Sequence, residues 1–431
     1  MFRKIGVDIT LLFTRWGHHL WYKAAGPVII QCYSTSHSIP QPSNPSAFQD
    51  STVRESIVPL TSDNRQLTSV SPSMRALRYY GPGDIRLEHG VPEPVCDAHQ
   101  VKIRPNFCGI CGSDLHAYHS PDVLPFKDTP HPITGETWPI TLGHEFSGDV
   151  VEIGARAQVP NGLQVGDRVA VQPTICCNQC IPCKEGLTNC CDSFGFVGLM
   201  GWGGGLSDYV CVDARFVFKL PETIPSDIGA LIEPLAVAWH AIEQSAAKAG
   251  DNILIMGAGP IGLAILQCLK TRKPAQLIVA EVASNRRELA RQFGATAVIN
   301  PQEEDVISKC KLLCNGQGPE IAFDCAGVAA SIKSACLSVR SRGTVVNVAK
   351  WDTEIPFDMN DLLFGEKRLL SALSYTTTDF ERVIDALGSG SMNVEGMITR
   401  KITIDKVVED GILALLHQKE RDIKILVDVR K

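Results

Sequence analysis

A glycine-rich turn at residues 257–262 places the strongest restriction on how this chain can fold. It follows the pattern G-x-G-x-x-G and lies between a short apolar run at residues 253–256 and a stretch of helical character at residues 261–269. A strand, such a turn and a helix bind the pyrophosphate of a dinucleotide, because the backbone comes close to the phosphates and the helix N-terminus faces their charge. The residues expected to bind the dinucleotide are Gly257, Gly259, Pro260, Ile261 and Gly262.

The choice of dinucleotide depends on an acidic residue expected about 20 residues after the turn. Glu281 stands there, directly after the apolar run 277–280. Its carboxylate can accept both ribose hydroxyls and repels a 2′-phosphate, which favours NAD over NADP. Arg286, a further candidate cofactor residue, and Arg287 weaken that preference, since a guanidinium pairs with a 2′-phosphate. The alternative is a glycine-rich turn in a sheet that binds another ligand.

The fold class follows from how apolar runs are spaced along the chain. Runs at residues 297–299, 321–323 and 344–348 alternate with helical stretches, which indicates a parallel sheet covered on both faces. The region from residue 74 to about 211 instead shows short strands and turns, and residues 101–105 alternate with period two. We expect an α/β fold: a doubly wound parallel-sheet (Rossmann) nucleotide domain beside a mainly β catalytic domain.

Composition excludes several classes of protein. The 431 residues are 44% hydrophobic and 20% charged, which is enough apolar material for a core and excludes disorder along the whole chain. No stretch reaches the roughly 18 apolar residues that a membrane span needs. The formal net charge of −6 argues against a nucleic-acid partner, which would favour a basic surface.

The first 73 residues differ from the rest. Residues 1–33 are basic and apolar with Asp8 as the only acid, and residues 34–73 are half Ser, Thr or Pro. This pair is typical of a mitochondrial transit segment plus a linker. The alternative is a segment upstream of the true start at Met74, and neither contributes to the fold. We expect a cytoplasmic enzyme, or a mitochondrial one if residues 1–33 form a transit segment.

A dense cysteine cluster indicates a metal site. Six of the 16 cysteines fall within residues 176–191, and three of them are spaced C-x2-C-x2-C. Four thiolates close a tetrahedral shell around zinc, which makes such a site structural. The candidate ligands are Cys177, Cys180, Cys183 and Cys191. Disulfides and idle thiols are the alternatives, and spacing alone does not choose between these residues and the adjacent Cys176 and Cys190.

Two further motifs combine ligand types. Residues 108–116 hold two thiols, a hydroxyl, a carboxylate and an imidazole, and residues 143–145 read Gly-His-Glu. Three protein ligands around zinc leave one position open for substrate or water. Each motif alone is a weak signal, since a Gly-His-Glu turn is often only polar.

Together these motifs resemble the zinc-containing alcohol and polyol dehydrogenases, the medium-chain dehydrogenase/reductase family, over residues 74–431. The order C-G-x-C-G-S-D-x-H, G-H-E, four-cysteine lobe and nucleotide motif is that of the family. The resemblance implies a GroES-like catalytic domain and selects Cys177, Cys180, Cys183 and Cys191 for a structural zinc. It also implies a catalytic zinc, NAD as the second cofactor, and a homodimer or homotetramer.

The resemblance also assigns roles in the catalytic site. It implies that Cys111 and His144 bind the catalytic zinc, with Glu145 as an adjacent ligand or close partner. Glu233 resembles the metal-site carboxylate of the polyol and butanediol branch, where the better-known alcohol dehydrogenases carry a cysteine. Ser113 would bond the substrate oxygen, and His116 would relay its proton to solvent. By the same comparison Asp114 orients a histidine ligand and Cys108 is not a ligand.

The substrate class is inferred from similarity alone. Residues 131–148 resemble the segment before Gly-His-Glu in fungal members that act on 2,3-butanediol. We expect hydride transfer between a secondary alcohol of a small diol and NAD, most simply between (R,R)-2,3-butanediol and acetoin. A sorbitol, xylitol or threonine dehydrogenase of the same branch is the alternative, and a non-catalytic NAD-binding protein is the alternative from another class.

The expected domain limits follow from these assignments. Residues 1–73 form the extension, 74–235 the catalytic domain with its cysteine lobe, 236–375 the nucleotide domain, and 376–431 a return to the catalytic domain. The active site is expected in the cleft between the two domains.

Overall fold

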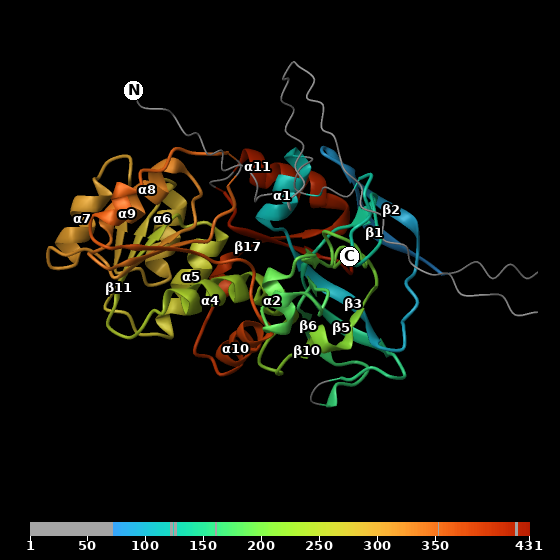
Figure 1. Ribbon diagram of the computed structural model, residues 1–431. Coiled ribbons are helices and arrows are strands. Elements are labelled where there is room, and N and C mark those ends of the chain that lie inside the picture. Colours follow the sequence, from blue (N-terminus) through green and yellow to red (C-terminus); the bar gives the residue numbers. More distant parts are fainter. Residues whose placement is uncertain (1–71, 121–123, 125–126, 160–161, 352, 419–420) are drawn as a thin grey trace, which may run out of the picture. The chain divides into compact units, whose positions relative to one another are not determined.

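The computed structural model describes residues 72–120, 124, 127–159, 162–351, 353–418 and 421–431 (Figure 1). All of them belong to one compact unit of the chain. The targeting or linker segment expected at residues 1–73 lies, up to residue 71, outside the described residues. Among the helices of the described part, none is both long and apolar enough to cross a membrane.

A seven-stranded, largely antiparallel sheet forms the core of the mainly β part. Its order is β10-β6-β5-β3-β18-β17, with β9 also pairing with β3. The strands are β3 (Gln100–Gly109), β5 (Glu145–Ile153), β6 (Arg168–Val171), β9 (Val210–Asp213), β10 (Val217–Lys219), β17 (Ile398–Thr403) and β18 (Lys424–Asp428). The alternation expected at residues 101–105 is only partly present, since Val101 and Ile103 are fully buried within β3 but Lys102 between them is buried too, in an ion pair with Glu93.

Smaller elements surround this sheet. A three-stranded sheet has the order β2-β1-β4, and β7 pairs with β8. These strands are β1 (Ser73–Gly81), β2 (Asp84–Pro92), β4 (Ile140–Thr141), β7 (Thr174–Ile175) and β8 (Gly195–Phe196). The accompanying helices are α1 (Gly112–His119), α2 (Ile181–Lys184) and α3 (Ser226–Gly229).

The second sheet is entirely parallel, with the order β13-β12-β11-β14-β15-β16. Its strands are β11 (Asn252–Met256), β12 (Gln276–Ala280), β13 (Ala297–Ile299), β14 (Ile321–Asp324), β15 (Thr344–Asn347) and β16 (Arg368–Ser371). The helices near these strands in Figure 1 include α4 (Ile232–Ser245), α5 (Pro260–Lys270), α6 (Ser284–Gln292), α7 (Val306–Leu313), α8 (Ala329–Ser338) and α9 (Asn360–Leu363).

This sheet is buried on both faces, as the continuous apolar runs predicted. Within β11, Ile253 and Ile255 belong to one buried cluster, whereas Leu254 and Met256 belong to another. Alternate side chains therefore pack on opposite sides of the sheet, which requires covering layers on both. The expected doubly wound fold beside a mainly β part is confirmed.

The chain returns to the antiparallel sheet after the parallel one. Helix α10 (Thr377–Gly388) follows β16, and β17 then pairs in parallel with β18. After β17 the chain passes through a π-helix at Val407–Leu413 and α11 (Ala414–His417). Strand β18 pairs antiparallel with β3, with Leu426 opposite Gly109, so the C-terminal strand lies beside the catalytic motifs. The domain limits expected at residues 235 and 375 remain predictions.

Candidate active site and metal centres

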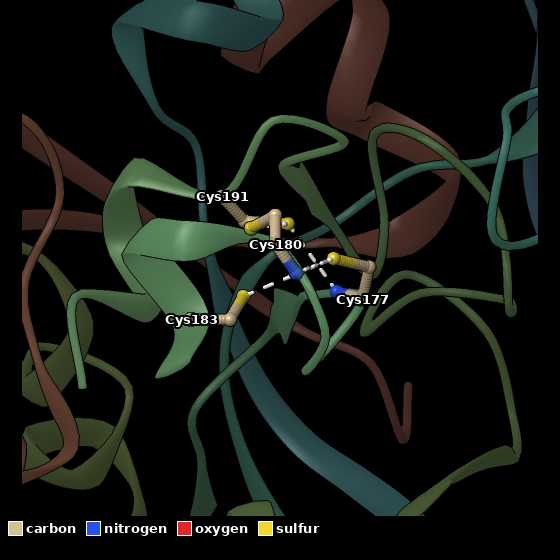
Figure 2. A group of neighbouring side chains, drawn as sticks. All are labelled: Cys177, Cys180, Cys183 and Cys191. Carbon is tan, nitrogen blue, oxygen red and sulfur yellow. Dashed lines mark hydrogen bonds between the residues drawn. The ribbon is translucent and has the colours of Figure 1, made fainter. Parts of the chain in front are cut away.

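Four cysteine side chains converge around the start of α2 (Figure 2). The Sγ atoms of Cys177, Cys180, Cys183 and Cys191 all lie within 4.8 Å of one another. Cys177 and Cys183 are separated by 4.0 Å between sulfurs, and Cys180 and Cys191 by 3.9 Å. Sulfurs of a tetrahedral zinc site with bonds of about 2.3 Å stand roughly 3.8 Å apart, so the cluster has the dimensions of such a site.

The two neighbouring cysteines are outside this cluster. Cys190 is exposed, and Cys176 is buried with its thiol donating to Asn178 Oδ1 at 3.3 Å. All cysteines in the described part of the chain are free, which removes the disulfide alternative for this lobe. The local geometry therefore agrees with the choice of Cys177 and Cys191 over their neighbours.

Backbone amides prepare the cluster for thiolates. The amides of Cys177 and Ser193 donate to Cys191 Sγ at 3.2 and 3.4 Å, and the amide of Cys180 donates to Cys177 Sγ at 3.4 Å. Bonds from the amides of Gln179 and Cys180 lower the pKa of Cys177 to about 6. Burial raises the pKa of Cys183 and Cys191 instead, so the amides favour the metal-binding thiolate form at Cys177 in particular.

A second group of ligand atoms forms where β3 ends and β5 begins. Cys111, His144 and Glu145 place donor atoms within 4.8 Å of one another. The register explains the meeting, because Gly109 pairs with Glu145 across β3 and β5. A Cβ on Gly109 would lie 2.0 Å from Glu145 Oε2, so the glycine leaves space for this carboxylate. Cys108 is buried outside the group.

Glu145 is held by a lysine from the C-terminal strand. Lys424 Nζ donates to Glu145 Oε1 at 2.8 Å and Oε2 at 2.7 Å, and also to the carbonyl of Ile110 at 3.2 Å. Burial opposes the charge on Lys424, but the attraction of Glu145 outweighs it and raises the pKa of the lysine. Lys424 was not among the residues expected from the sequence. The available signal was a lone lysine within the apolar run 423–427, which requires a buried counter-charge.

Glu233 is buried on the first turn of α4 and lies close to this group. Burial raises its pKa to about 7, and the charges of His144, Glu145 and Lys424 also act on it. Tyr375 donates its hydroxyl proton to Glu233 Oε1 at 2.9 Å. The metal-binding group found among the described residues does not include Glu233, so its role as a ligand stays a prediction. Tyr375 was also missed, since nothing local in sequence connects it to Glu233.

Residues of α1 surround His144. Ser113 Oγ lies 3.1 Å from His144 Nε2, and Asp114 Oδ1 lies 3.8 Å from His144 Nδ1. Asp114 also accepts from the amide of Cys111 at 2.9 Å, which ties both ligand-bearing segments to one carboxylate. His116 is on the same helix, outside the metal-binding group, and its relay role stays a prediction.

A cavity of about 740 Å³ opens at the carboxyl ends of β11, β12 and β14. Gly257, Gly259, Glu281 and Arg286 line it, together with residues that follow β14 such as Ala326. Ligands of open parallel sheets bind at this edge. Pro260, Ile261 and Gly262 form the first turn of α5, and a Cβ on Gly262 would lie 1.9 Å from the carbonyl oxygen of Gly257.

Glu281 joins the glycine turn to the end of β12. Its Oε2 accepts from the amide of Ala258 at 2.7 Å, and its Oε1 accepts from the amide of Ala283 at 2.8 Å. Each carboxylate oxygen keeps a further lone pair for a ribose hydroxyl. The Arg287 guanidinium donates to the carbonyls of Glu281 and Val282, whereas Arg286 lines the cavity.

Comparisons with known proteins agree with this geometry. Residues 97–222 match the family described as alcohol dehydrogenase GroES-like domain, and residues 260–389 match zinc-binding dehydrogenase. The chain is 37% identical over 354 residues to (R,R)-butanediol dehydrogenase of Bacillus subtilis, covering 82% of this chain and 99% of that protein.

Two further similarities extend this result. (R,R)-butanediol dehydrogenase of Saccharomyces cerevisiae is 33% identical, with 82% of this chain and 98% of the relative covered. The crystal structure of 2R,3R-butanediol dehydrogenase from Bacillus subtilis superposes with a TM-score of 0.77 at 37% identity, over 83% of this chain and 99% of that one. The resemblance to butanediol dehydrogenases, fungal ones included, is therefore confirmed.

Proposed function

Because the chain belongs to the zinc-binding alcohol dehydrogenase family, we propose that it oxidises a secondary alcohol of a small diol with NAD, interconverting (R,R)-2,3-butanediol and acetoin. The observation that carries this proposal is the group formed by half-buried Cys111 and buried His144 and Glu145, with buried Glu233 beside it. Its thiol, imidazole and carboxylates are the donor types of a catalytic zinc site.

The donor set fits a zinc ion in two places. Cys111 and His144, with Glu145 or Glu233, would hold a catalytic ion, and the four cysteines of the α2 lobe would hold a structural one. His144 Nδ1 and Asp114 Oδ1 are buried 3.8 Å apart without a hydrogen-bond partner among the described residues, which places a carboxylate beside the ring nitrogen that a zinc-ligating histidine turns toward such a partner. Zinc bound there supplies Lewis-acid chemistry, which lowers the pKa of a coordinated hydroxyl.

Side chains of the protein bind the substrate oxygen and transfer the proton of the substrate hydroxyl. Ser113, 3.1 Å from His144 Nε2, is placed to hydrogen-bond the substrate oxygen, and the imidazole of His116 on the same helix would take up the hydroxyl proton and release it to solvent. Glu233, held by the bond from the Tyr375 hydroxyl, would serve as a carboxylate ligand of the catalytic ion. NAD, when bound, would supply the hydride acceptor for the carbinol carbon.

The residues that line the cavity at the sheet edge would hold the cofactor. Glu281, with both oxygens tied to backbone amides, accepts the two ribose hydroxyls and disfavours a 2′-phosphate. NAD is therefore proposed over NADP, and Arg286 on the cavity wall is a further residue that would hold it.

A substrate panel with NAD and NADP measured separately tests the proposal. We expect the highest kcat/KM with (R,R)-2,3-butanediol and NAD, and turnover abolished in Cys111→Ser while NAD binding is kept. Faster oxidation of sorbitol, xylitol or threonine would instead identify the protein as a polyol or threonine dehydrogenase. Absence of NADH formation with every alcohol, despite bound NAD, identifies a non-catalytic protein.

A second copy of this chain is the proposed partner. Strand β16 forms one edge of the parallel sheet, and all four of its residues are exposed. Leu369 and Leu370 in this strand and Leu373 just after it are exposed apolar side chains. An exposed apolar edge strand favours pairing with an identical strand. Light scattering on the full chain tests this, and Leu370→Lys should shift the mass from dimer or tetramer to monomer.

The compartment is proposed as the cytoplasm, with the mitochondrial matrix if residues 1–33 act as a transit segment. Sequencing of the mature N-terminus in cells distinguishes the two. A chain that begins between residue 33 and residue 73 inside mitochondria would favour the transit segment, whereas a cytoplasmic chain that begins near Met74 would favour the cytoplasm.

A further inference from the structure

A series of buried hydrogen bonds connects the four-cysteine lobe to the wall of the catalytic site. It begins at Asn189 in the short 3₁₀-helix η2 (Thr188–Cys190), two residues before Cys191. Asn189 is buried, its Nδ2 donates to the carbonyl of Leu373 at 2.8 Å, and the same atom lies 3.4 Å from His240 Nε2. The lobe therefore holds a segment 184 residues further along the chain.

The protonation of this network is determined by its partners. His240 Nδ1 lies 2.8 Å from Asp379 Oδ2, and a carboxylate accepts only, so Nδ1 carries the proton. In the neutral imidazole Nε2 is then an acceptor. The amide group of Asn189 has two N–H bonds, one for the Leu373 carbonyl and one for His240 Nε2, and both acceptors are satisfied.

The far end of the network reaches the catalytic carboxylate. Asp379 accepts from the amide and the hydroxyl of Thr376, at 2.9 and 2.7 Å, where α10 begins. Tyr375, the preceding residue, donates to Glu233 Oε1 at 2.9 Å. Leu373, Tyr375 and Thr376 are therefore each held by a separate bond.

The backbone of this segment needs such bonds. Ser374 has a φ of +52°, a left-handed conformation that is unfavourable for a residue other than glycine. Ser374 lies between Leu373, held by Asn189, and Tyr375, held by Glu233. Bonds on both sides stabilise the strained residue, and loss of either one permits it to relax.

Helix α4 presents both anchor points on one face. Glu233 and His240 are seven residues apart, which is close to two helical turns. The same face therefore contacts Tyr375 at one position and Asp379 at the other. A shift of residues 373–376 along α4 would move the Tyr375 hydroxyl away from Glu233.

We propose that Asn189 is a positioning residue for the dehydrogenase reaction. Through the Leu373 carbonyl and His240 it sets where Tyr375 holds the Glu233 carboxylate, so the four-cysteine lobe contributes to the catalytic geometry as well as to local folding. The effect on turnover rests on the function proposed above, whereas the coupling between Asn189 and Tyr375 does not.

Fluorine NMR of the full chain labelled with 3-fluorotyrosine tests the coupling directly. The Tyr375 signal is assigned by its loss in Tyr375→Phe. We expect Asn189→Ala and the isosteric Asn189→Asp, which cannot donate, to shift or broaden that signal at unchanged zinc content. Cys190→Ser, an exposed neighbour in the same η2 helix, should leave it in place. An unmoved signal in both Asn189 variants, or loss of zinc from both, overturns the proposal.

A double-mutant cycle tests the consequence for catalysis. With 2,3-butanediol and NAD, Asn189→Ala should lower kcat/KM about tenfold in the wild-type background and less than twofold in Tyr375→Phe, because the coupled contact is already lost. Equal losses in both backgrounds contradict action through Tyr375. If the wild type fails to oxidise the diol, the proposed function is wrong, and the NMR result still decides the coupling.

Discussion

Lys424 donates to both carboxylate oxygens of Glu145, and this ion pair is enclosed, with 1% of Lys424 and 0% of Glu145 exposed. The pair joins the last strand of the chain to the first residue of β5, next to His144. The charge of Glu145 is balanced by the protein itself, so the metal-binding group is organised by long-range pairing.

Removal of the lysine should therefore be costly. Lys424→Met keeps the bulk but leaves a buried carboxylate unpaired, and we expect the free energy of unfolding to fall by about 3–5 kcal/mol. Denaturant unfolding of the zinc-loaded protein measures this. The control is Lys401→Met on the neighbouring strand, whose ion pair with Asp227 is partly exposed and should contribute at most about 1 kcal/mol. Equal effects of the two substitutions would contradict the buried-pair interpretation.

The four-cysteine lobe should account for one zinc ion per chain. Cys180→Ser removes one of the four converging thiols, so we expect the structural ion to be lost while the catalytic one is kept. Metal analysis of the purified variant gives the stoichiometry. The control is Cys190→Ser, which changes an exposed thiol outside the cluster and should keep both ions. Loss of zinc from this control variant would show that the cluster has been misassigned.

Glu281 should govern the choice of dinucleotide. Glu281→Gln places an amide where two backbone N–H groups now donate to a carboxylate. Loss of charge-assisted bonds of about 1.5–3 kcal/mol should lower kcat/KM with NAD by roughly ten- to a hundredfold. The ratio of NADP to NAD activity should rise. Glu288→Gln, in the exposed part of α6, serves as the control, and an unchanged cofactor ratio in Glu281→Gln would exclude the ribose contact.

The His240–Asp379 pair should contribute a pH-dependent part of stability. Burial opposes ionisation of Asp379, but bonds from His240 and Thr376 outweigh it and hold its pKa below the ordinary value of 3.8. A carboxylate whose pKa is lowered by folding adds stability that is fully present above the unfolded value and is lost as pH falls through the folded value. Asp379→Asn should therefore destabilise the protein most near neutral pH, and the difference from wild type should shrink below about pH 4.

Urea unfolding at a series of pH values measures that difference. Asp385→Asn, at an exposed position of the same helix, should show no comparable pH-dependent loss. A destabilisation by Asp379→Asn that stays constant from neutral pH to below pH 4 would assign its contribution to packing or capping instead of charge.

The elements with strong local patterns were predictable from sequence. The turn at Gly257 and Gly259 lies where its glycine spacing indicated, because the tight turn and the close packing of α5 on β11 need glycine within six consecutive residues. The cysteine lobe is also local, since its ligands span residues 177–191. In both cases one short segment carries nearly all of the chemistry.

Contacts between segments far apart in the chain were not predictable from the sequence. Glu145 meets Lys424 because β18 inserts beside β3, and Glu233 meets Tyr375 because the chain leaves the parallel sheet after β16 and crosses α4. Spacing along the chain carries no information on these pairings, and a shift of one residue in strand register would turn Lys424 to the opposite face of the sheet.

Residue type and short-range order were thus sufficient to indicate a nucleotide fold, a zinc lobe and candidate ligands. The tertiary structure alone decided which carboxylate a lysine neutralises and which one a tyrosine bonds. It also decided how Asn189 reaches the segment that carries that tyrosine. The physical reason is that buried charges and polar atoms require partners, and tertiary structure alone determines which partners lie within hydrogen-bond distance.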